Sequence, residues 1–462
     1  MTLPTDLTQK RALVYSMGIE GRDLARWLLA AGASVTVSDT RSAEDLAAVP
    51  PDGVERVVSG QALLDPEGFD VVAVSQSVLR SDPAMQKVRK LELPFTSQMR
   101  LFLQLCPSGR VIGITGASGK STTTSLVGAM AEAAGLDYVV GGNLGIGGNL
   151  GPALLEHLPE IRPETTVILE ISHTQLQYTD RSPGVAAIMN ITPNHLDQFT
   201  WDEYVGLKQH LIEYQGPDDI AVFNQDDQTS RAVSSSAMGQ IWLTSLEEPV
   251  DGSGGWIEEG HVVIREGGAQ RRVADLAMSR LRGRHNLANT VMACTIAAAA
   301  GIPDEAMRSA IASFPGVAHR LEIVGQLRGV TWINDSIATT PERTAAGLDS
   351  FAEPIVLLLG GRDKHLPLDV LQRQIKKRCR AVVCFGEAGD LFHEAVVRTG
   401  VPCTRVEDLK GATAIAADLA AEGDVVLLSP AATSFDAYPN FEARGRAFGE
   451  LFTKLSGGGE DK

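Results

Sequence analysis

The chain has 462 residues, of which 44% are hydrophobic and 21% charged, and its 57 acidic against 41 basic side chains give a formal net charge of −16. The length predicts about three domains, at about 150 residues per domain. The acidic balance repels nucleic-acid phosphate, so no nucleic-acid partner is expected. The sequence offers no signal peptide and no membrane span, and its five cysteines have no metal-like spacing. We therefore expect a cytoplasmic protein without a structural zinc site.

The alternation of β-forming and helical segments predicts an α/β fold of parallel sheets covered by helices. The pattern restarts three times along the chain. This predicts a Rossmann-like N-terminal domain at residues 1–107, a P-loop ATPase-like central domain at 108–316 and a Rossmann-like C-terminal domain at 317–455. The glycine-rich, charged end at 456–462 is expected to be disordered.

The expected elements follow in chain order. In the first domain they are strands at 12–15, 34–38, 54–59 and 71–75 and a helix at 22–31. In the second they are strands at 110–115, 166–170, 186–190 and 220–224, helices at 121–134 and 286–300, and an antiparallel segment at 250–272. In the third they are strands at 331–334, 355–360, 381–385 and 425–429.

The first glycine turn, Ser16–Gly21, follows a strand and precedes a helix, with Asp39 about twenty residues further on. This resembles a dinucleotide fingerprint that lacks one glycine. Two interpretations stay open, a plain strand–helix turn and a site for a nucleoside diphosphate. Asp39, Thr40 and Arg41 end the second strand, where a ribose or uracil would be bound, and a surface turn is the alternative.

The strongest motif is Thr115–Ser121, with the sequence TGASGKS, between an apolar strand and a helix. Its glycines let backbone N–H groups turn toward phosphate oxygens, and the helix N-terminus adds positive potential. Lys120 would reach the β- and γ-phosphates of a triphosphate, and Ser121 would contact Mg²⁺. The strict spacing requires glycine at position 114, which is isoleucine, so the loop is a shortened variant. A plain glycine turn that caps a helix is the alternative.

Three polar residues follow strands of the same domain. Glu170 ends a buried strand beside the phosphate loop, which is the expected place for a Mg²⁺ ligand. His195 comes just after the next strand, where a satisfied polar histidine is an equal alternative. Lys208 lies on a helix thirteen residues further on and by default would be an exposed lysine.

Further polar clusters lie at strand ends and helix starts. Asn286 and Asn289 stand one helical turn apart, suited to reading a base edge or to capping. Arg320 follows a Pro-Gly boundary and would be either a phosphate clamp or a surface ion pair. Asp335 and the segment 429–436 follow two strands of the third domain, where ligands bind in α/β sheets.

Taken together, these motifs resemble the Mur ligases of peptidoglycan synthesis, and most closely the members that add D-glutamate to UDP-N-acetylmuramoyl-L-alanine. The resemblance runs from about Val14 to Phe452. It rests on ordered matches: TGASGKS, EISHTQ, NITPNHLDQF, GRHNLAN, HRLE, NDS-AT, LGGRDK and SPAATSFDAYPNFEARG. It implies a monomer that uses ATP and Mg²⁺, with UDP-N-acetylmuramoyl-L-alanine and glutamate as substrates.

The resemblance also implies roles for residues at matching positions. Lys120, His195 and Lys208 would be catalytic, and Lys208 would be carbamylated. The Mg²⁺ ligands would be Ser121, Glu170, His195 and Lys208. The ATP site would comprise Gly116, Ala117, Ser118, Gly119, Lys120, Ser121, Thr122, Asn286, Asn289, Arg320 and Asp335. The UDP-substrate would contact Gly18, Asp39, Thr40, Arg41, Asn143, Ser172 and Gln175, and the incoming amino acid Thr339, Lys364, Ser434 and Phe441.

The sequence departs from the family pattern at three places. The family's Asn-Asp-Ser-Lys ends here in Ile337, so a lysine near the amino-acid site is missing, and Lys364 and His365 are candidates to compensate. The usual Ser-Ser-Phe-Gln reads Ser-His-Thr-Gln at 172–175, and the Ser-Pro-Gly turn reads Ser-Gln-Ser at 75–77. These changes leave L-glutamate open as the amino acid, and another Mur-type ligase is the more distant alternative.

Two other classes of protein compete with the ligase. A nicotinamide-dependent oxidoreductase would use the first glycine turn, but would leave Lys120, Glu170 and Lys208 without a role. A non-catalytic nucleotide-binding regulator would bind a UDP-sugar without needing Lys120.

Overall fold

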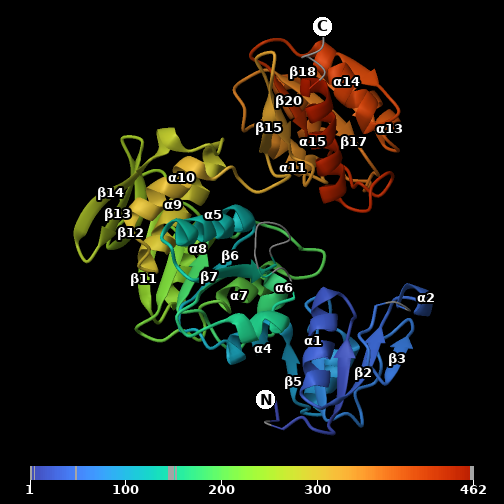
Figure 1. The fold of residues 1–462 in the computed structure, drawn as a ribbon, viewed down its shortest axis with the longest axis vertical. Coiled ribbons are helices and arrows are strands. Elements are labelled where there is room, and N and C mark those ends of the chain that lie inside the picture. The colour runs from blue at the N-terminus through green and yellow to red at the C-terminus, as the bar shows by residue number, and fades with distance from the viewer. Residues whose placement is uncertain (1–2, 5, 47–48, 144–149, 151–152, 458–462) are drawn as a thin grey trace. The chain divides into compact units, whose positions relative to one another are not determined.

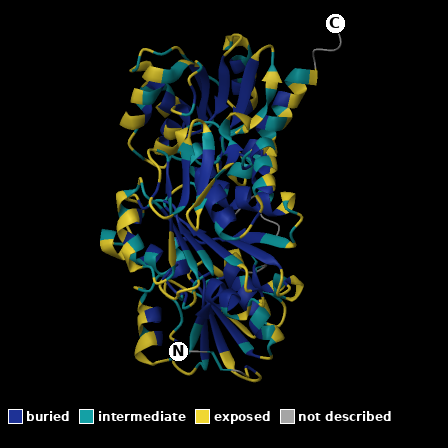
Figure 2. Cartoon of the chain, turned by 90° about the vertical axis from the view of Figure 1, so that its left-hand side faces the viewer, coloured by how far each residue is buried: buried dark blue, intermediate teal, exposed yellow. Residues whose placement is uncertain are grey.

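The computed structural model describes residues 3–4, 6–46, 49–143, 150 and 153–457. The chain forms two compact units, Met1–Ser279 with Ala288–Ser313 and Arg280–Leu287 with Phe314–Lys462. The first unit holds two sheets and the second unit one (Figure 1). Within each unit the central strands are buried, whereas β3, β15 and the start of β14 carry exposed residues (Figure 2). The predicted α/β fold of parallel-dominated sheets is confirmed.

The predicted division into three domains remains a proposal, in which each sheet corresponds to one domain. Most of the tail expected at 456–462 lies outside the described residues, and the last helix ends at Gly457. Residues 144–149, which follow Asn143 of the predicted substrate site, also lie outside them.

The first sheet is five-stranded and parallel, in the order β3-β2-β1-β4-β5. Its central strands β1 and β4 are almost entirely apolar and buried, as expected where both faces of a parallel sheet are covered. Its helix α3 begins at a proline, and the Asp82 side chain accepts from the Ala84 N–H to cap it. The elements are β1 Arg11–Tyr15, α1 Ile19–Ala30, β2 Ser34–Asp39, α2 Ala43–Leu46, β3 Arg56–Ser59, β4 Val71–Val74, α3 Pro83–Lys90, β5 Phe95–Ser97 and α4 Gln98–Leu105.

The second sheet has nine strands in the order β14-β13-β12-β11-β10-β9-β6-β8-β7. The pairs of β13 with β12 and with β14 are antiparallel, as the glycine-rich segment predicted, and the others are parallel. The elements up to the centre are β6 Val111–Thr115, α5 Lys120–Ala133, β7 Tyr138–Gly142, η1 Leu155–Glu160, β8 Thr166–Glu170, α6 His173–Leu176, β9 Val185–Ile188, α7 Trp201–Gln209 and β10 Ile220–Asn224. The rest are α8 Gln228–Val233, η2 Ser234–Ser236, β11 Gln240–Ser245, β12 Ser253–Glu258, β13 His261–Glu266, β14 Ala269–Asp275, η3 Leu276–Met278, α9 Arg284–Ala299 and α10 Asp304–Ser313.

Strand β6 lies between β8 and β9, and all three run parallel. Their carboxyl ends therefore meet at one edge of the sheet, which places the phosphate loop, Glu170 and the segment after β9 together. This is the topological position at which open α/β sheets bind ligands.

The third sheet has six strands in the order β15-β16-β20-β17-β18-β19, of which only the β15–β16 pair is antiparallel. Two apolar clusters cover its faces, one around Leu357, Leu359 and Phe392 and one around Trp332, Phe448 and Phe452. The elements are β15 Glu322–Leu327, β16 Val330–Asn334, α11 Pro341–Leu348, β17 Ile355–Gly360, α12 Asp369–Arg378, β18 Cys379–Phe385, α13 Gly389–Val397, β19 Cys403–Arg405, α14 Leu409–Leu419, β20 Val425–Leu428 and α15 Phe441–Gly457.

Candidate active site

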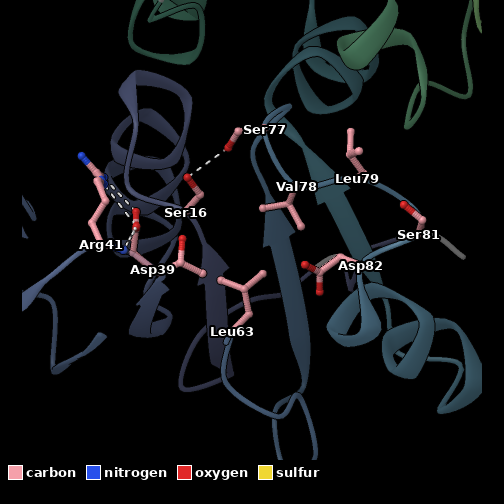
Figure 3. Close-up of a pocket in the computed structure, with 10 residues that line it drawn as sticks. Ser16, Asp39, Arg41, Leu63, Ser77, Val78, Leu79, Ser81 and Asp82 are labelled. Carbon is pink, nitrogen blue, oxygen red and sulfur yellow. Dashed lines mark hydrogen bonds and ion pairs between the residues drawn. The ribbon is translucent and has the colours of Figure 1, made fainter. Parts of the chain in front are cut away.

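A pocket of about 460 Å³ opens at the carboxyl ends of the strands of the first sheet (Figure 3). Its lining includes the predicted Asp39, Thr40 and Arg41, together with Ser16, Leu63 and the segment 77–82 except Arg80. The segment 77–82 was missed as a site by sequence reasoning. Its only signal was the altered turn at 75–77, which was noted as a departure.

Asp39 is held ionised at the base of this pocket. Its carboxylate accepts from the Met17 N–H at 2.6 Å and from two guanidinium nitrogens of Arg41, the nearer at 2.8 Å. Burial opposes ionisation, but the hydrogen bonds from Arg41 and Met17 outweigh it and lower the pKa of Asp39 to about 2. The pocket thus presents a fixed anionic acceptor beside a partly exposed guanidinium, a polar set suited to a base and a phosphate.

The predicted Gly18 is the N-cap of α1, and a Cβ there would meet nothing within 4 Å. Gly21 is the more constrained position, since a Cβ on it would lie 1.9 Å from the Ser16 carbonyl oxygen. The glycine that the turn requires sterically is therefore Gly21, which lets α1 pack against the end of β1.

The phosphate loop connects β6 to α5. The Asn190 side-chain oxygen accepts from the N–H groups of Ala117 and Ser118, at 3.1 and 2.9 Å, and the Ala117 N–H also donates to the Asn190 backbone carbonyl at 2.8 Å. Converging backbone N–H groups of this kind form an oxyanion-binding concavity. Gly119 has φ of 82°, and a Cβ on it would lie 2.2 Å from the Asn289 amide oxygen, so the predicted Asn289 lies at this loop.

Lys120 and Lys208 meet at the start of the same loop. Each donates to the carbonyl oxygen of Gly116, at 3.0 Å in both cases. Lys208 is 1% exposed, contrary to the default of an exposed lysine. Burial, and after it the positive charge of Lys120, lowers its pKa well below the ordinary value, although Glu170 opposes this.

Glu170 has a side-chain oxygen that could bind a cation. Its Oε1 accepts from Asn143 Nδ2 at 3.1 Å, whereas its Oε2 is buried without a hydrogen-bond partner. A buried carboxylate oxygen of this kind fits a divalent ion. Within the described residues no three His, Cys, Asp or Glu side chains are grouped as a ready metal site. A hard ion such as Mg²⁺ would complete its shell with water and phosphate oxygens, so the residues present fit it.

His195 lies in the loop after β9 and has a positive φ of 56°. Its ring stacks on that of His173, with centroids 4.2 Å apart, and the His173 ring also contacts Phe199 and Tyr204. Burial, followed by the charge of His195, lowers the pKa of His173 to about 3, so its imidazole is neutral. His173 was not predicted as a site residue; it was noted only as a departure from the family pattern.

The predicted substrate residues Ser172 and Gln175 lie just beyond Glu170. They form a capping box at the start of α6, in which each side chain bonds to the backbone N–H of the other. Gln175 also donates to Glu20 of α1 at 2.8 Å, and the Ser172 hydroxyl donates to the Gln76 side-chain oxygen at 2.7 Å. These contacts join the first sheet to the edge of the second sheet that carries the phosphate loop.

In the second unit, the predicted Asp335 follows β16. It accepts from the Ser429 hydroxyl at 2.8 Å and from the Leu321 N–H at 3.2 Å. Burial raises the pKa of Asp335 to about 7, although hydrogen bonds and the charge of Arg320 oppose the shift. Asn286 is in the same unit and donates to the Arg282 carbonyl at 2.8 Å. The structure therefore brings Arg320 into electrostatic range of Asp335, and it places the two predicted amides, Asn286 and Asn289, one turn apart on α9.

The predicted amino-acid residues cluster around the loops after β16, β17 and β20. Lys364 donates to the Thr339 hydroxyl at 3.3 Å. The Ser336 hydroxyl donates to the Phe441 carbonyl at 2.9 Å, and Ser434 is 2% exposed.

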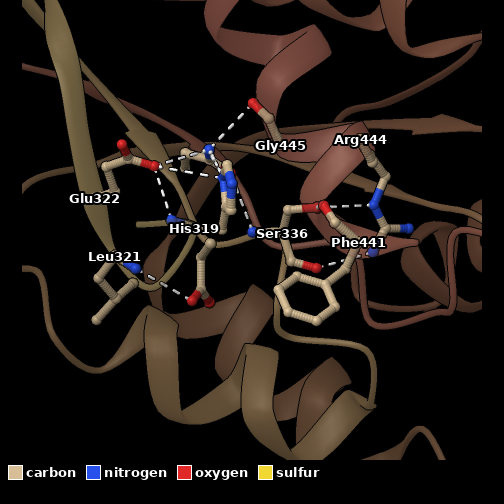
Figure 4. A network of polar contacts seen from close by, with 9 residues as sticks. His319, Leu321, Glu322, Ser336, Phe441, Arg444 and Gly445 are labelled. Carbon is tan, nitrogen blue, oxygen red and sulfur yellow. Dashed lines mark hydrogen bonds and ion pairs between the residues drawn. The ribbon is translucent and has the colours of Figure 1, made fainter. Parts of the chain in front are cut away.

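A buried arginine that sequence reasoning missed, Arg444 of α15, holds these loops together (Figure 4). It donates to the Ser336 hydroxyl and carbonyl, both at 2.9 Å. It also donates to the carbonyls of Gly360, Ala432 and Thr433. Because it is fully buried, its pKa falls to about 10, which still leaves it charged at neutral pH. Its only signal was its place in the EARG segment that starts the last helix.

Two family signatures match the chain. The Mur ligase middle domain matches residues 114–297, and the Mur ligase glutamate ligase domain matches residues 319–432. No helix in the described part of the chain is long and apolar enough to cross a membrane.

Three relatives share the name UDP-N-acetylmuramoylalanine–D-glutamate ligase. The one from Symbiobacterium thermophilum is 38% identical and covers 97% of this chain and 99% of its own. The one from Koribacter versatilis is 35% identical and covers 98% of this chain and 99% of its own. The one from Clostridium botulinum is 33% identical and covers 96% of this chain and 97% of its own.

Solved structures share the fold. The UDP-N-acetylmuramate-alanine ligase of Thermotoga maritima matches with a TM-score of 0.58 at 16% identity, over 97% of this chain and all of that one. A UDP-N-acetylmuramoyl-L-alanyl-D-glutamate–2,6-diaminopimelate ligase matches with a TM-score of 0.57 at 17% identity, over 96% of this chain and 93% of that one.

Proposed function

The chain belongs to the Mur ligase family, and from this we propose that it joins D-glutamate to UDP-N-acetylmuramoyl-L-alanine with conversion of ATP to ADP and phosphate. It is thus an ATP-dependent amide ligase of peptidoglycan precursor synthesis, with roles in cell-wall formation, cell shape and division. The observation that carries the proposal is the meeting of Lys120, Lys208 and the unpartnered Glu170 oxygen at the phosphate loop.

The reaction needs two steps because a carboxylate is a poor electrophile. The terminal carboxylate of the UDP-substrate first attacks the γ-phosphorus of ATP, which forms an acyl phosphate and releases ADP. The amine of glutamate then attacks the acyl carbon, loses a proton, and phosphate leaves. Lys120 would neutralise charge on the transferring phosphoryl oxygens, and the N–H groups of Ala117 and Ser118 would bind phosphate oxygens.

Ser121, Glu170 and His195 would hold Mg²⁺, with Lys208 as a further ligand once carbamylated. When bound, the ion would offset phosphate charge and orient the oxygens of ATP. The depressed pKa of Lys208 supports the carbamate, since only the neutral amine reacts with CO₂. His195 would also be placed to orient a ligand or accept a proton.

The pocket around Asp39, Thr40 and Arg41 would take the uridine diphosphate end, and Asn143, Ser172 and Gln175 the muramoyl part. Asn286, Asn289, Arg320 and Asp335 would contact ATP, along with the loop from Gly116 to Thr122. Thr339, Lys364, Ser434 and Phe441 would bind glutamate. We further propose that the enzyme acts in the cytoplasm as a monomer.

Product analysis tests this proposal directly. ATP, Mg²⁺, UDP-N-acetylmuramoyl-L-alanine and D-glutamate should yield ADP, phosphate and an adduct heavier by one glutamyl residue in equal amounts. Substrate labelled with ¹⁸O in its carboxylate should transfer one label to phosphate. Hydrolysis of ATP that is independent of the UDP-substrate would refute the proposal, and so would the absence of an adduct.

A further inference from the structure

Two of the three places where the sequence departs from the family pattern are in direct contact. The side-chain oxygen of Gln76, in the turn after β4, accepts from the Ser172 hydroxyl at 2.7 Å and from the Thr174 hydroxyl at 2.8 Å. The two hydroxyls are 3.0 Å apart. Neither segment would make this three-membered cluster with the usual family residues, since proline at 76 has no side-chain acceptor and phenylalanine at 174 has no hydroxyl.

The contacts of Gln76 with Ser172 and Thr174 form a joint between the first and second sheets, and the backbone of Gln76 extends this joint. Its N–H donates to Glu20 Oε2 at 2.8 Å, and Gln175 Nε2 donates to Glu20 Oε1 at the same distance. The Gln76 carbonyl accepts from Gln177 Nε2 at 3.3 Å. Glu20 is 7% exposed, so both of its oxygens depend on these donors. Gln76 therefore bonds directly to the segment after β8 through its side-chain oxygen and its carbonyl, and its N–H is linked to the same segment through Glu20.

The position of this joint matters because of what lies on each side. Gln76 is followed directly by Ser77 and Val78, which line the pocket. Ser172 comes two residues after Glu170, the carboxylate with the unpartnered oxygen. A substrate that is bound in the pocket at one end and reacts beside Glu170 at the other must extend across the joint. Its reacting end is placed correctly only if the joint is rigid.

We propose that Gln76 is a positioning residue for the UDP-substrate: through Ser172 and Thr174 it sets the pocket for the nucleoside diphosphate at a fixed place relative to the phosphate loop. This rests on the proposed function, because only a substrate with a diphosphate at one end and a reacting carboxylate at the other needs both places. UDP alone occupies one side of the joint and does not depend on Gln76.

The test compares UDP with UDP-N-acetylmuramoyl-L-alanine, each titrated calorimetrically into wild type and Gln76→Ala, with phosphate release measured in parallel. This variant keeps the N–H that Glu20 needs and removes only the acceptor. We expect UDP affinity within about twofold of wild type, and affinity for the full substrate about tenfold weaker, the loss of one to two hydrogen bonds. The matched control is Gln86→Ala, which replaces an exposed glutamine on α3 and should change neither the affinity for UDP nor the affinity for the full substrate.

A double-mutant cycle with Thr174→Ala adds a readout that general destabilisation would not give. Gln76→Ala should weaken binding of the full substrate less in Thr174→Ala than in wild type, since one of its two hydroxyl partners is already gone and only the bond from Ser172 remains to be lost. Additive losses would contradict the inference, as would equal losses for UDP and the full substrate. If Gln76→Ala binds the full substrate with wild-type affinity, the inference is wrong but the proposed function stands. A wild-type chain that binds UDP but not the full substrate would instead refute the proposed function, and the inference with it.

Discussion

Lys120 and Lys208 donate hydrogen bonds to the same backbone oxygen, that of Gly116, each at 3.0 Å. Two ammonium groups on one carbonyl repel each other, and Lys208 is the more deeply buried of the two, so burial and the charge of Lys120 lower the pKa of Lys208. We propose that Lys120 supplies the positive charge for phosphate and that Lys208 is the amine that reacts with CO₂.

Replacement of Lys120 by Ala should reduce phosphate release by at least about a thousandfold, because the charge that stabilises the transferring phosphoryl group is lost. UDP binding should not change, since Lys120 does not line the pocket. Calorimetry with UDP and a phosphate assay measure the two effects. A variant that keeps more than about a tenth of the wild-type rate would contradict the assigned role.

The lowered pKa of Lys208 predicts a dependence of the activity on CO₂. Enzyme prepared in CO₂-free buffer should lose most of its activity and regain it on addition of bicarbonate, while Lys208→Arg, whose side chain stays protonated, should be inactive in both. A carbamate carbon signal in the NMR spectrum of protein incubated with ¹³C-bicarbonate, missing in Lys208→Arg, is the direct measurement. Full activity without CO₂ and no such signal would refute carbamylation.

Asp335 predicts a pH dependence of stability. Its pKa is about 7 in the folded chain and about 4 when unfolded, so between these values the folded state binds the extra proton. The protonated carboxyl therefore stabilises the folded state at low pH, and this contribution is lost as the pH rises through 7. The free energy of unfolding should fall by about 2–3 kcal/mol between pH 5 and 7.5. Urea midpoints at the two pH values should differ less in Asp335→Asn than in wild type. An equal or larger difference in the variant would show that Asp335 ionises normally.

The missing family lysine predicts a dependence on Lys364. Lys364→Ala should raise the KM for D-glutamate about tenfold or more and leave the KM for ATP unchanged, because it removes a cation beside the Thr339 hydroxyl. Ile337→Lys in that background should restore part of the loss, since position 337 adjoins the same loop. If Lys364→Ala leaves the KM for glutamate unchanged, another residue binds the carboxylate.

Local patterns predicted the parts of the site that are contiguous in sequence. The strand–turn–helix context located the phosphate loop, and the end of a buried strand located Glu170, because both signals lie within one short segment. The burial of Lys208 could not be predicted, because the sequence pattern of its helix is the same whether or not a neighbouring sheet covers it. The positions of β5, β7 and β19 were also missed, since strands this short or partly polar carry little periodicity.

The residues that were missed altogether act through tertiary contacts. Asn190 reaches the phosphate loop across more than seventy residues, Gln76 reaches Ser172 across 96, and Arg444 reaches Ser336 across 108. A single polar side chain in a loop or on a helix has no pattern that identifies its partner. Only the folded chain shows that these three side chains hold the loops of the site in place.

The most direct test of the whole account is phosphate release from ATP in the presence of UDP-N-acetylmuramoyl-L-alanine, with D-glutamate or L-glutamate as the acceptor. We predict that D-glutamate stimulates release and yields one adduct per ATP, that L-glutamate does so at least about tenfold less efficiently, and that omission of the UDP-substrate abolishes release. Equal or faster release with L-glutamate would contradict the assigned amino acid, and no stimulation by either would contradict the ligase itself.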